Sequence, residues 1–520
     1  MNDRTRLLAV LWTDLEHTLN HLGTYGGLMS PSVYDTAQCL RYNPPSNPWP
    51  AVSWLIEQQR KDGGWSTPTA PRARYMPTLA AILALVSLHP KRKSTLAAIQ
   101  GGLDFIRRRQ WDDWATLGDD LPGGVELILP LLLNHARDVK LPIDLEPYAA
   151  LVALGKQRST YIQTQTLSHL AGTTAAHGWE GWGEQPDPAF VDGSKTVGHS
   201  PTASAVWLSK ARSDPNLHDI CGHVEAGLQA AWAATTTTIE GVFTTCWPIT
   251  HFERTFALYP LLLAGFFNPS AASWIPLSTR AVIDRQITHL HAAITPKGLG
   301  FTDWFLADGD DTAVATAILA AYDHAVSPKT LMRFKSPHSN HFCAWQGELQ
   351  SSPSVTAHAL HALALLQHDE PLAGYQNYLL KQQLPSGLWA GEKWNISTIY
   401  TTSQIMIGLM QSGRVDVIPA LCQSLVLFQH PNGAWGMDEL SAEETSYAVL
   451  ALLMAKQAHL LPEELYPTLT QAKDWMCTEY RPFDPNGVPL WLGKEAYRPL
   501  RVSRSFEIVG LIALLQEEGV

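Results

Sequence analysis

The sequence has little cysteine, little charge and no long hydrophobic run. Its six cysteines are scattered along 520 residues, and no two have the C-x-x-C spacing of zinc or dithiol motifs. Sparse, dispersed thiols are typical of a reducing compartment. The first residues, "MNDRTRLLAVLWTDLEHTL", lack a signal-peptide pattern because acidic residues interrupt a short apolar run. No apolar run reaches the ~18 residues of a membrane-spanning helix, so we expect a cytoplasmic protein with at most peripheral membrane contact.

Charged residues make up only 16% of the chain, and the net charge of −11 is spread without a block of one sign. Nucleic-acid binding requires a basic stripe. The sequence contains none, so no nucleic-acid partner is expected. The chain is longer than one hydrophobic core usually organises, which predicts two or three domains. No feature of the sequence indicates an oligomeric state.

The main pattern in the sequence is a helical periodicity of its apolar residues. Alanine- and leucine-rich segments repeat apolar residues at three- and four-residue steps, and short Pro/Gly/Asn connectors separate them. No alternating strand pattern is convincing. The pattern predicts an all-α protein, with clear helices at 77–88, 312–325, 356–368 and 445–458.

A short motif recurs three times. Each copy has Gln at its start, Gly four residues later and Trp six residues later: "QRKDGGW" (59–65), "QLPSGLW" (383–389) and "QHPNGAW" (429–435). Gly permits the tight backbone that ends a helix. Repeated helix–turn units favour a helical barrel or solenoid. The first copy lies far from the other two, which predicts two helical domains.

The segment "LADGDDT" (306–312) contains three aspartates. A calcium-binding EF-hand loop would need Gly at its sixth position and Glu at its twelfth, which are Ala313 and Leu319 here. A D-D-x-x-D magnesium motif would need an acid at Val314. Two interpretations stay open. The cluster caps a helix or faces solvent, or burial and mutual repulsion keep one carboxyl protonated as a strong Brønsted acid.

An acid that protonates an alkene creates a carbocation, which requires a dry cavity with aromatic walls. The chain has 19 tryptophans. Ordinary core packing remains the alternative for each single ring. The aromatic residues that follow or precede the aspartates are the candidates for such a wall: Trp304, Trp345, Trp389, Trp394 and Tyr400.

These residues resemble a known family. "DGDDTA" matches the D-x-D-D motif of class II terpene cyclases, and the Gln–Gly–Trp repeats resemble the QW motifs of the superfamily that includes squalene–hopene cyclases. Further segments are similar to its diterpene cyclase branch, and they occur in family order from about residue 32 to 505. They include "SVYDTA" (32–37), "LPGGVELILP" (121–130), "HSPTASA" (199–205), "EKWNISTIYTT" (392–402) and "PLWLGKEAY" (489–497).

The resemblance implies two α-helical (α/α) barrel domains in a βγ arrangement. We expect residues 1–30 to form the first helix of the β domain, 31–272 an inserted γ domain, and 273–520 the rest of the β domain. The additional class I domain of plant members is not expected, because its D-D-x-x-D motif and length are missing. The product then keeps its diphosphate, and a separate class I synthase or transferase consumes it.

The resemblance also implies the roles of individual residues. Asp310 is the expected general acid, tuned by Asp308 and Asp311. Family members use Mg²⁺ with the substrate diphosphate. Asp119 and Asp120 are candidate metal ligands, although solvated loop aspartates are the alternative. Lys393 and Lys494 are candidates for diphosphate contacts, since basic groups suit phosphate oxygens.

The implied activity is that of an intramolecular lyase, an isomerase by class. It would protonate and bicyclise geranylgeranyl diphosphate to a copalyl-, halimadienyl- or kolavenyl-type diphosphate. Cyclisation of farnesyl diphosphate to drimenyl diphosphate is the alternative. Three competing classes lack a key residue set. A protein prenyltransferase subunit needs a zinc site, a thioester domain needs Cys where Trp182 stands, and a glycoside hydrolase needs two assignable acids.

Overall fold

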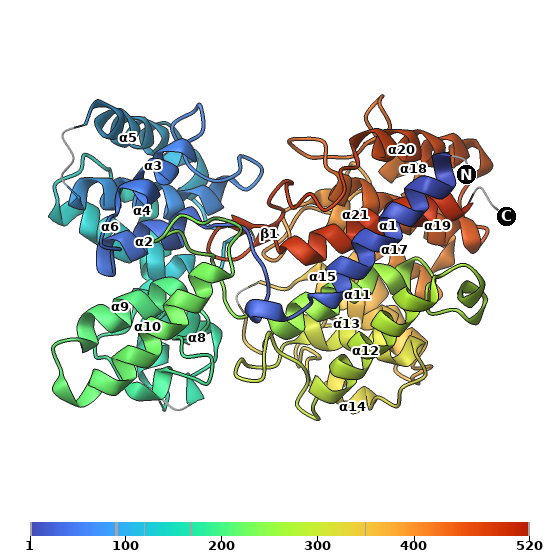
Figure 1. Cartoon of the computed structure of the whole chain (residues 1–520), viewed down its shortest axis with the longest axis horizontal. Helices are drawn as coiled ribbons and strands as arrows, with labels where there is room; N and C mark the ends of the chain where they lie inside the picture. The colour runs from blue at the N-terminus through green and yellow to red at the C-terminus, as the bar shows by residue number, and fades with distance from the viewer. Residues whose placement is uncertain (1–2, 89–91, 119, 167–168, 349, 518–520) are drawn as a thin grey trace.

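The regular secondary structure of the computed structural model is almost entirely helical. The structure describes residues 3–88, 92–118, 120–166, 169–348 and 350–517. The chain forms two lobes side by side (Figure 1). In the first domain lie α2 (Val33–Tyr42), α3 (Trp49–Glu57), α4 (Tyr75–Ser87), α5 (Lys93–Trp114), α6 (Val125–Asp138), α7 (Ala149–Gln163), α8 (Thr174–His177), α9 (Pro201–Ala211) and α10 (His218–Ala233).

The second domain contains the first helix of the chain and all helices after α10. They are α1 (Asp3–Asn20), α11 (Thr250–Leu263), α12 (Leu277–Ala293), α13 (Gly309–Ala321), α14 (Pro328–Met332), α15 (Pro353–Leu365), α16 (Ala373–Leu380), α17 (Thr398–Gln411), α18 (Ile418–Val426), α19 (Ala442–Gln457), α20 (Tyr466–Glu479) and α21 (Leu500–Glu517). Between α20 and α21, the strands β1 (Trp491–Leu492) and β2 (Ala496–Tyr497) form an antiparallel hairpin.

The second domain is a closed ring of inner helices. In the order α11, α13, α15, α17, α19 and α21, each helix packs against the next, and α21 packs back against α11. Inner helices such as α17 and α19 are buried along almost their whole length, which explains why their sequences are apolar on every side. The all-α barrel expected from the sequence is therefore present. In the first domain, α4 packs between α2 and α6, and α9 packs against α2.

The Gln–Gly–Trp repeats join an outer helix to the next inner helix. The Gln side-chain amide donates to the Gly carbonyl at 2.7–2.8 Å in all three copies. The Trp indole donates to a carbonyl ten residues earlier, and the Trp backbone N–H donates to a threonine hydroxyl on the following inner helix. Those threonines are Thr78, Thr402 and Thr445.

The boundary expected at 272/273 needs correction. Helix α11 (250–263) packs against α13 and α21, and its apolar residues belong to the core of the second domain. The chain therefore returns to this domain near residue 248, before α11 begins. Helix α1 packs against α12 and α21, so both ends of the described chain lie in the second domain (Figure 1).

The β1–β2 hairpin carries side chains of the second domain into the first. Lys494 Nζ lies 2.6 Å from Glu180 Oε1 and 2.6 Å from Ser200 Oγ. The adjacent Glu495 accepts backbone N–H groups from Val33 and Tyr34 at the start of α2. This hairpin fixes the two domains against each other. No helix in the described ranges is both long enough and apolar enough to span a membrane.

Candidate active site

Asp308 caps helix α13. Its Oδ1 accepts the backbone N–H groups of Asp310 at 2.9 Å and Asp311 at 2.8 Å, which is the standard role of an N-cap carboxylate. The favourable interaction of a helix N-terminus with an anion is therefore taken up by Asp308. The side chain of Asp310 makes no contact of this kind, so it is free for another function.

Asp310 faces a histidine on the neighbouring inner helix. Its Oδ1 lies 2.6 Å from His358 Nδ1, and His358 Nε2 lies 3.2 Å from Gln404 Oε1 on α17. When His358 Nε2–H donates to Gln404, the neutral ring presents its Nδ1 lone pair to Asp310. In that tautomer His358 Nδ1 can accept a hydrogen bond from a carboxyl O–H of Asp310.

The two flanking carboxyls are deeply buried. Burial raises the pKa of Asp308 to about 7. Burial and the nearby Asp308 charge raise the pKa of Asp311 well above its ordinary value. Neither oxygen of Asp311 receives a donor, and Asp308 Oδ2 receives none either, among the described residues. A proton on Asp311 that is shared with Asp308 satisfies both groups, so the cluster holds protons at neutral pH.

The three aspartates share a cavity with aromatic side chains. Trp345 and Trp394 form one wall, where their rings meet edge to face with centroids 5.3 Å apart. Trp491 forms another wall, and its ring contacts Phe252 and Phe256. Phe301 and Tyr497 complete the aromatic lining. A strong acid in an aromatic, largely apolar chamber is suited to protonating an alkene and stabilising the cation that results.

The structure brings only part of the predicted aromatic set to this cavity. Trp345 and Trp394 line it. Tyr400 is buried behind it, with its ring 6.3 Å from His358 and 5.6 Å from Trp491 between centroids. The predictions for Trp304 and Trp389 need correction. Trp304 is 47% exposed and borders a separate hollow, and Trp389 is a core residue of a Gln–Gly–Trp turn.

A second cavity lies between the two domains. Trp345 and Trp394 line it as well, so these two rings separate it from the aspartate chamber. Its charged lining includes Glu126 and Arg158 from the first domain, and Glu348 and Lys393 from the second. Arg158 Nη2 also lies 3.5 Å from the Gly347 carbonyl across the domain boundary. Cations beside an apolar chamber suit a substrate with an anionic head and a hydrocarbon tail.

The two predicted lysines have different surroundings. Lys393 borders the interdomain cavity, where its Nζ lies 3.0 Å from Glu348 Oε2. Lys494 is 1% exposed, pairs with Glu180 and borders neither cavity. Its assignment to a diphosphate contact is therefore corrected to that of an interdomain ion pair.

The predicted metal ligands can be compared with the structure only at Asp120, because Asp119 lies outside the described residues. Asp120 is exposed and forms an ion pair with Arg72. Among the described residues, the carboxylates that line the interdomain cavity are Glu126 and Glu348, and Glu348 Oε1 is buried with no hydrogen-bond partner there. Burial also raises the pKa of both carboxyls. These two residues fit a cation beside an anionic ligand better than the exposed Asp120 does.

One further metal-like group occurs among the described residues. Ligand atoms of His341, Cys343 and Glu348 lie within 4.8 Å of one another. Glu348 Oε2 is already used by Lys393 and by the N–H groups of Ala344 and Trp345. One oxygen of Glu348 is therefore occupied in this loop, and the mixed imidazole, thiol and carboxylate set does not suit Mg²⁺, which prefers oxygen ligands, so this group of three is not assigned to a metal.

Sequence reasoning missed His358, Arg158 and Glu126. His358 lies in the predicted helix 356–368, within the segment "TAHALHALAL". A histidine inside so apolar a segment could have indicated a functional residue. Glu126 lies within the matched segment "LPGGVELILP". Arg158 lies outside every motif, and only the approach of α7 to the second domain identifies it.

Comparisons with known proteins agree with this geometry. Residues 299–461 match the family model of the squalene-hopene cyclase C-terminal domain. The chain is 40% identical over 526 residues to a (+)-kolavenyl diphosphate synthase of Herpetosiphon aurantiacus, covering 98% of each chain. It is 28% identical to a terpentedienyl-diphosphate synthase of Kitasatospora griseola, covering 91% of this chain and 95% of that one. The fold matches that of an ent-copalyl diphosphate synthase from Streptomyces platensis with a TM-score of 0.76, at 24% identity, over 99% of this chain and 100% of that one.

Proposed function

Because this chain belongs to the class II diterpene cyclases, which are intramolecular lyases, we propose that its substrate is geranylgeranyl diphosphate. Its product is then a bicyclic diterpenyl diphosphate. The 40% identity to a kolavenyl diphosphate synthase along the whole chain makes kolavenyl diphosphate the first product to test. Copalyl- and halimadienyl-type products share the same initial cation. Cyclisation of farnesyl diphosphate is not favoured, because the relatives are named for diterpenyl diphosphates.

The position of Asp310 carries the proposal. Asp308 caps the helix and Asp311 is buried behind it, so Asp310 is the carboxyl that combines a hydrogen-bond partner with access to the cavity. Its side chain is 13% exposed. Asp310 transfers its proton to the terminal isopropylidene alkene of the substrate. The polyene closes two rings by anti addition, and hydride and methyl shifts follow before a base or water ends the cascade.

The aromatic chamber protects this cation. Trp345, Trp394 and Trp491 present ring faces and edges in place of water, which would quench the intermediate. After each turnover His358 Nδ1 takes up a proton from solvent and passes it along its hydrogen bond to Asp310, which replaces the proton that the terminating base removes from the product cation. The chain's own residues therefore provide the acid, its partner and the cation-stabilising walls.

The diphosphate is proposed to lie in the interdomain cavity, against Lys393 and Arg158. Both cations match phosphate oxygens, and Arg can bind two of them at once. Glu126 and Glu348 would hold Mg²⁺ at this end, where the ion neutralises charge on the diphosphate. Because the diphosphate is far from the reacting alkene, the product retains it. A separate class I synthase or transferase then uses that product.

The test is incubation of the purified protein with geranylgeranyl diphosphate or farnesyl diphosphate and Mg²⁺. Products are dephosphorylated and identified by gas chromatography with mass spectrometry. We expect one bicyclic diterpene alcohol from the first substrate, and Asp310→Ala should abolish it while circular dichroism shows an intact fold. Asp303→Asn is a matched control, since that carboxylate is 72% exposed. Bicyclic product from Asp310→Ala would show that another group is the acid.

A further inference from the structure

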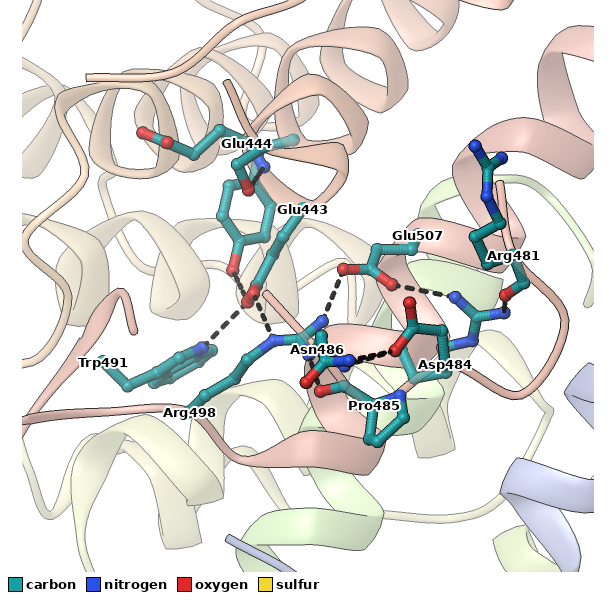
Figure 2. Close-up of polar contacts among 12 residues, drawn as sticks. Glu443, Glu444, Arg481, Asp484, Pro485, Asn486, Trp491, Arg498 and Glu507 are labelled. Carbon is teal, nitrogen blue, oxygen red and sulfur yellow. Dashed lines mark hydrogen bonds and ion pairs between the residues drawn. The ribbon is translucent and has the colours of Figure 1, made fainter. Parts of the chain in front are cut away.

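Glu443 is a buried carboxylate behind the cation chamber. It lies in the first turn of α19 and is 1% exposed. Its Oε1 accepts two hydrogen bonds, from the Trp491 indole Nε1 at 3.1 Å and from the Tyr447 hydroxyl at 2.5 Å. Figure 2 shows Glu443 between Trp491 and Arg498. Since an indole nitrogen can only donate, this geometry requires an accepting oxygen at Glu443.

Glu443 belongs to a buried cluster of acidic and basic side chains that holds one more carboxylate than guanidinium groups. Arg498 Nε lies 3.7 Å from Glu443 Oε2, while Arg498 Nη2 lies 2.5 Å from Glu507 Oε1. Glu507 Oε2 lies 3.2 Å from Arg504 Nη1, and Arg504 also binds Asp14 on α1. The connected cluster thus has three carboxylates and two guanidinium groups. Burial raises the pKa of Glu443, and Arg498 opposes that rise.

Trp491 connects this cluster to the substrate chamber. Its ring lines the cavity that holds the three aspartates, and its N–H points back to Glu443. The ring also packs at 5.2 Å from Phe256 and 5.3 Å from Phe252 between centroids. A charge-assisted hydrogen bond fixes the indole plane more firmly than packing alone. It also places negative charge next to the ring, which strengthens the attraction of the indole face for a cation.

On the basis of the function proposed above, we propose that Glu443 is a positioning residue for the cyclisation cascade. It holds Trp491 through the indole N–H, and its charge makes the ring a better partner for the carbocation. Glu443 does not touch the substrate. Its effect is on the step in which the cation forms and rearranges, so it changes kcat rather than substrate binding.

The neighbouring Glu444 provides a matched control. It is equally buried, but it points away from Trp491 (Figure 2) and accepts from the Ser397 hydroxyl at 2.5 Å and the Met437 N–H at 3.3 Å. Glu444→Gln removes a buried charge from the same turn of α19 without changing the contact with Trp491. Any loss of activity that arises only from impaired folding should therefore appear in both Glu443→Gln and Glu444→Gln.

The experiment combines kinetics with a double-mutant cycle. We expect Glu443→Gln to lower kcat about tenfold, the size of a weakened cation–π contact, with KM within about twofold of the wild type. Glu444→Gln should keep kcat within about twofold. In a Trp491→Phe background, which lacks the indole N–H, Glu443→Gln should have almost no further effect. An equal loss of kcat in both backgrounds would overturn the proposal.

A second measurement does not depend on activity. The indole ¹H–¹⁵N resonance of Trp491 is assigned by its disappearance in Trp491→Phe. Glu443→Gln should shift it upfield, because a neutral acceptor replaces a charged one, and Glu444→Gln should leave it in place. If the chemical shift of the Trp491 indole resonance is unchanged in Glu443→Gln, this inference is overturned. Failure of the wild type to make bicyclic product from geranylgeranyl diphosphate would instead overturn the proposed function.

Discussion

His358 Nδ1 lies 2.6 Å from Asp310 Oδ1, and the two residues come from adjacent inner helices of the barrel. The contact joins Asp310, which does not cap the helix, to a group that can accept and return a proton. It supports the proposal that Asp310, rather than Asp308 or Asp311, acts as the acid of the cluster. His358 should therefore matter for turnover more than for substrate affinity.

We expect His358→Phe to reduce kcat about 100-fold, in the range seen for loss of a proton-transfer partner, with KM little changed. His361→Asn is the control, because His361 also lies in α15 but contacts the Tyr259 hydroxyl instead. Steady-state kinetics with geranylgeranyl diphosphate measure both variants. A His358→Phe enzyme with wild-type kcat would show that Asp310 regains its proton by another route.

Trp304 stands next to the aspartate motif in the sequence, but we expect it to be dispensable for catalysis. Trp345 is distant in the sequence, and we expect it to be required. Trp345→Ala removes a wall between the acid chamber and the interdomain cavity. We expect kcat to fall at least about tenfold and water-quenched, hydroxylated products to increase. Trp304→Ala changes an exposed ring and should keep both rate and product. Product analysis by gas chromatography distinguishes the two. Equal effects would contradict the assignment of the cavity.

Lys393 should contribute to substrate binding. Lys393→Ala removes a cation from the interdomain cavity, and we expect KM for the diphosphate substrate to rise about tenfold, since charged hydrogen bonds are worth ~1.5–3 kcal/mol. The effect on kcat should be smaller. Lys335→Ala is the control, because Lys335 pairs with Glu370 and borders neither cavity. An unchanged KM for Lys393→Ala would show that the diphosphate does not bind against Lys393.

Lys494 should contribute to stability instead. Lys494→Met leaves the fully buried Glu180 without its cationic partner, and breaking one side of such a pair costs ~3–5 kcal/mol. We expect a large drop in melting temperature. Lys456→Met, which affects a partly exposed pair with Glu517, should cost only ~0–1 kcal/mol. Thermal unfolding followed by circular dichroism compares them. Similar melting temperatures would show that the hairpin contact is not important for stability.

The raised pKa of Asp308 predicts a pH dependence of stability. The unfolded carboxyl ionises near pH 4, and the folded one near pH 7. Between these values the unfolded state loses its proton first, so the contribution of Asp308 to stability falls as the pH rises to about 7. Asp308→Asn keeps a capping side chain but does not titrate. Its melting temperature relative to the wild type should be higher at pH 8 than at pH 5. A constant difference would contradict the raised pKa.

Much of the fold was accessible from the sequence because its signals are local. The Gln–Gly–Trp spacing reflects hydrogen bonds within one helix–turn–helix unit, as for Trp389, whose indole and amide bonds both lie within 13 residues. The D-x-D-D motif is equally local, since Asp308 caps the helix that carries Asp310. Patterns of this kind can be recognised without any knowledge of the tertiary structure.

The surroundings of individual site residues and the domain boundary could not be predicted from the sequence, because they depend on contacts between distant segments. Lys393 and Lys494 both stand in matched motifs, but only the packing of the domains puts one at a cavity and the other against Glu180. Trp304 is four residues from Asp308, yet the turn between them directs it outward. The apolar sequence of α11 fits either domain core, which explains the error of about one helix in the boundary.

The interruption of the second domain after α1 has a practical consequence. The first domain is an insertion whose two ends, near residues 30 and 248, both emerge from the second domain. Neither domain can therefore be produced by a single truncation, since any such cut separates α1 from α21. Exchange of the first domain between relatives requires two junctions made together. Such a chimaera would keep the aspartate cluster and its aromatic cavity while replacing Glu126 and Arg158 at the proposed diphosphate end.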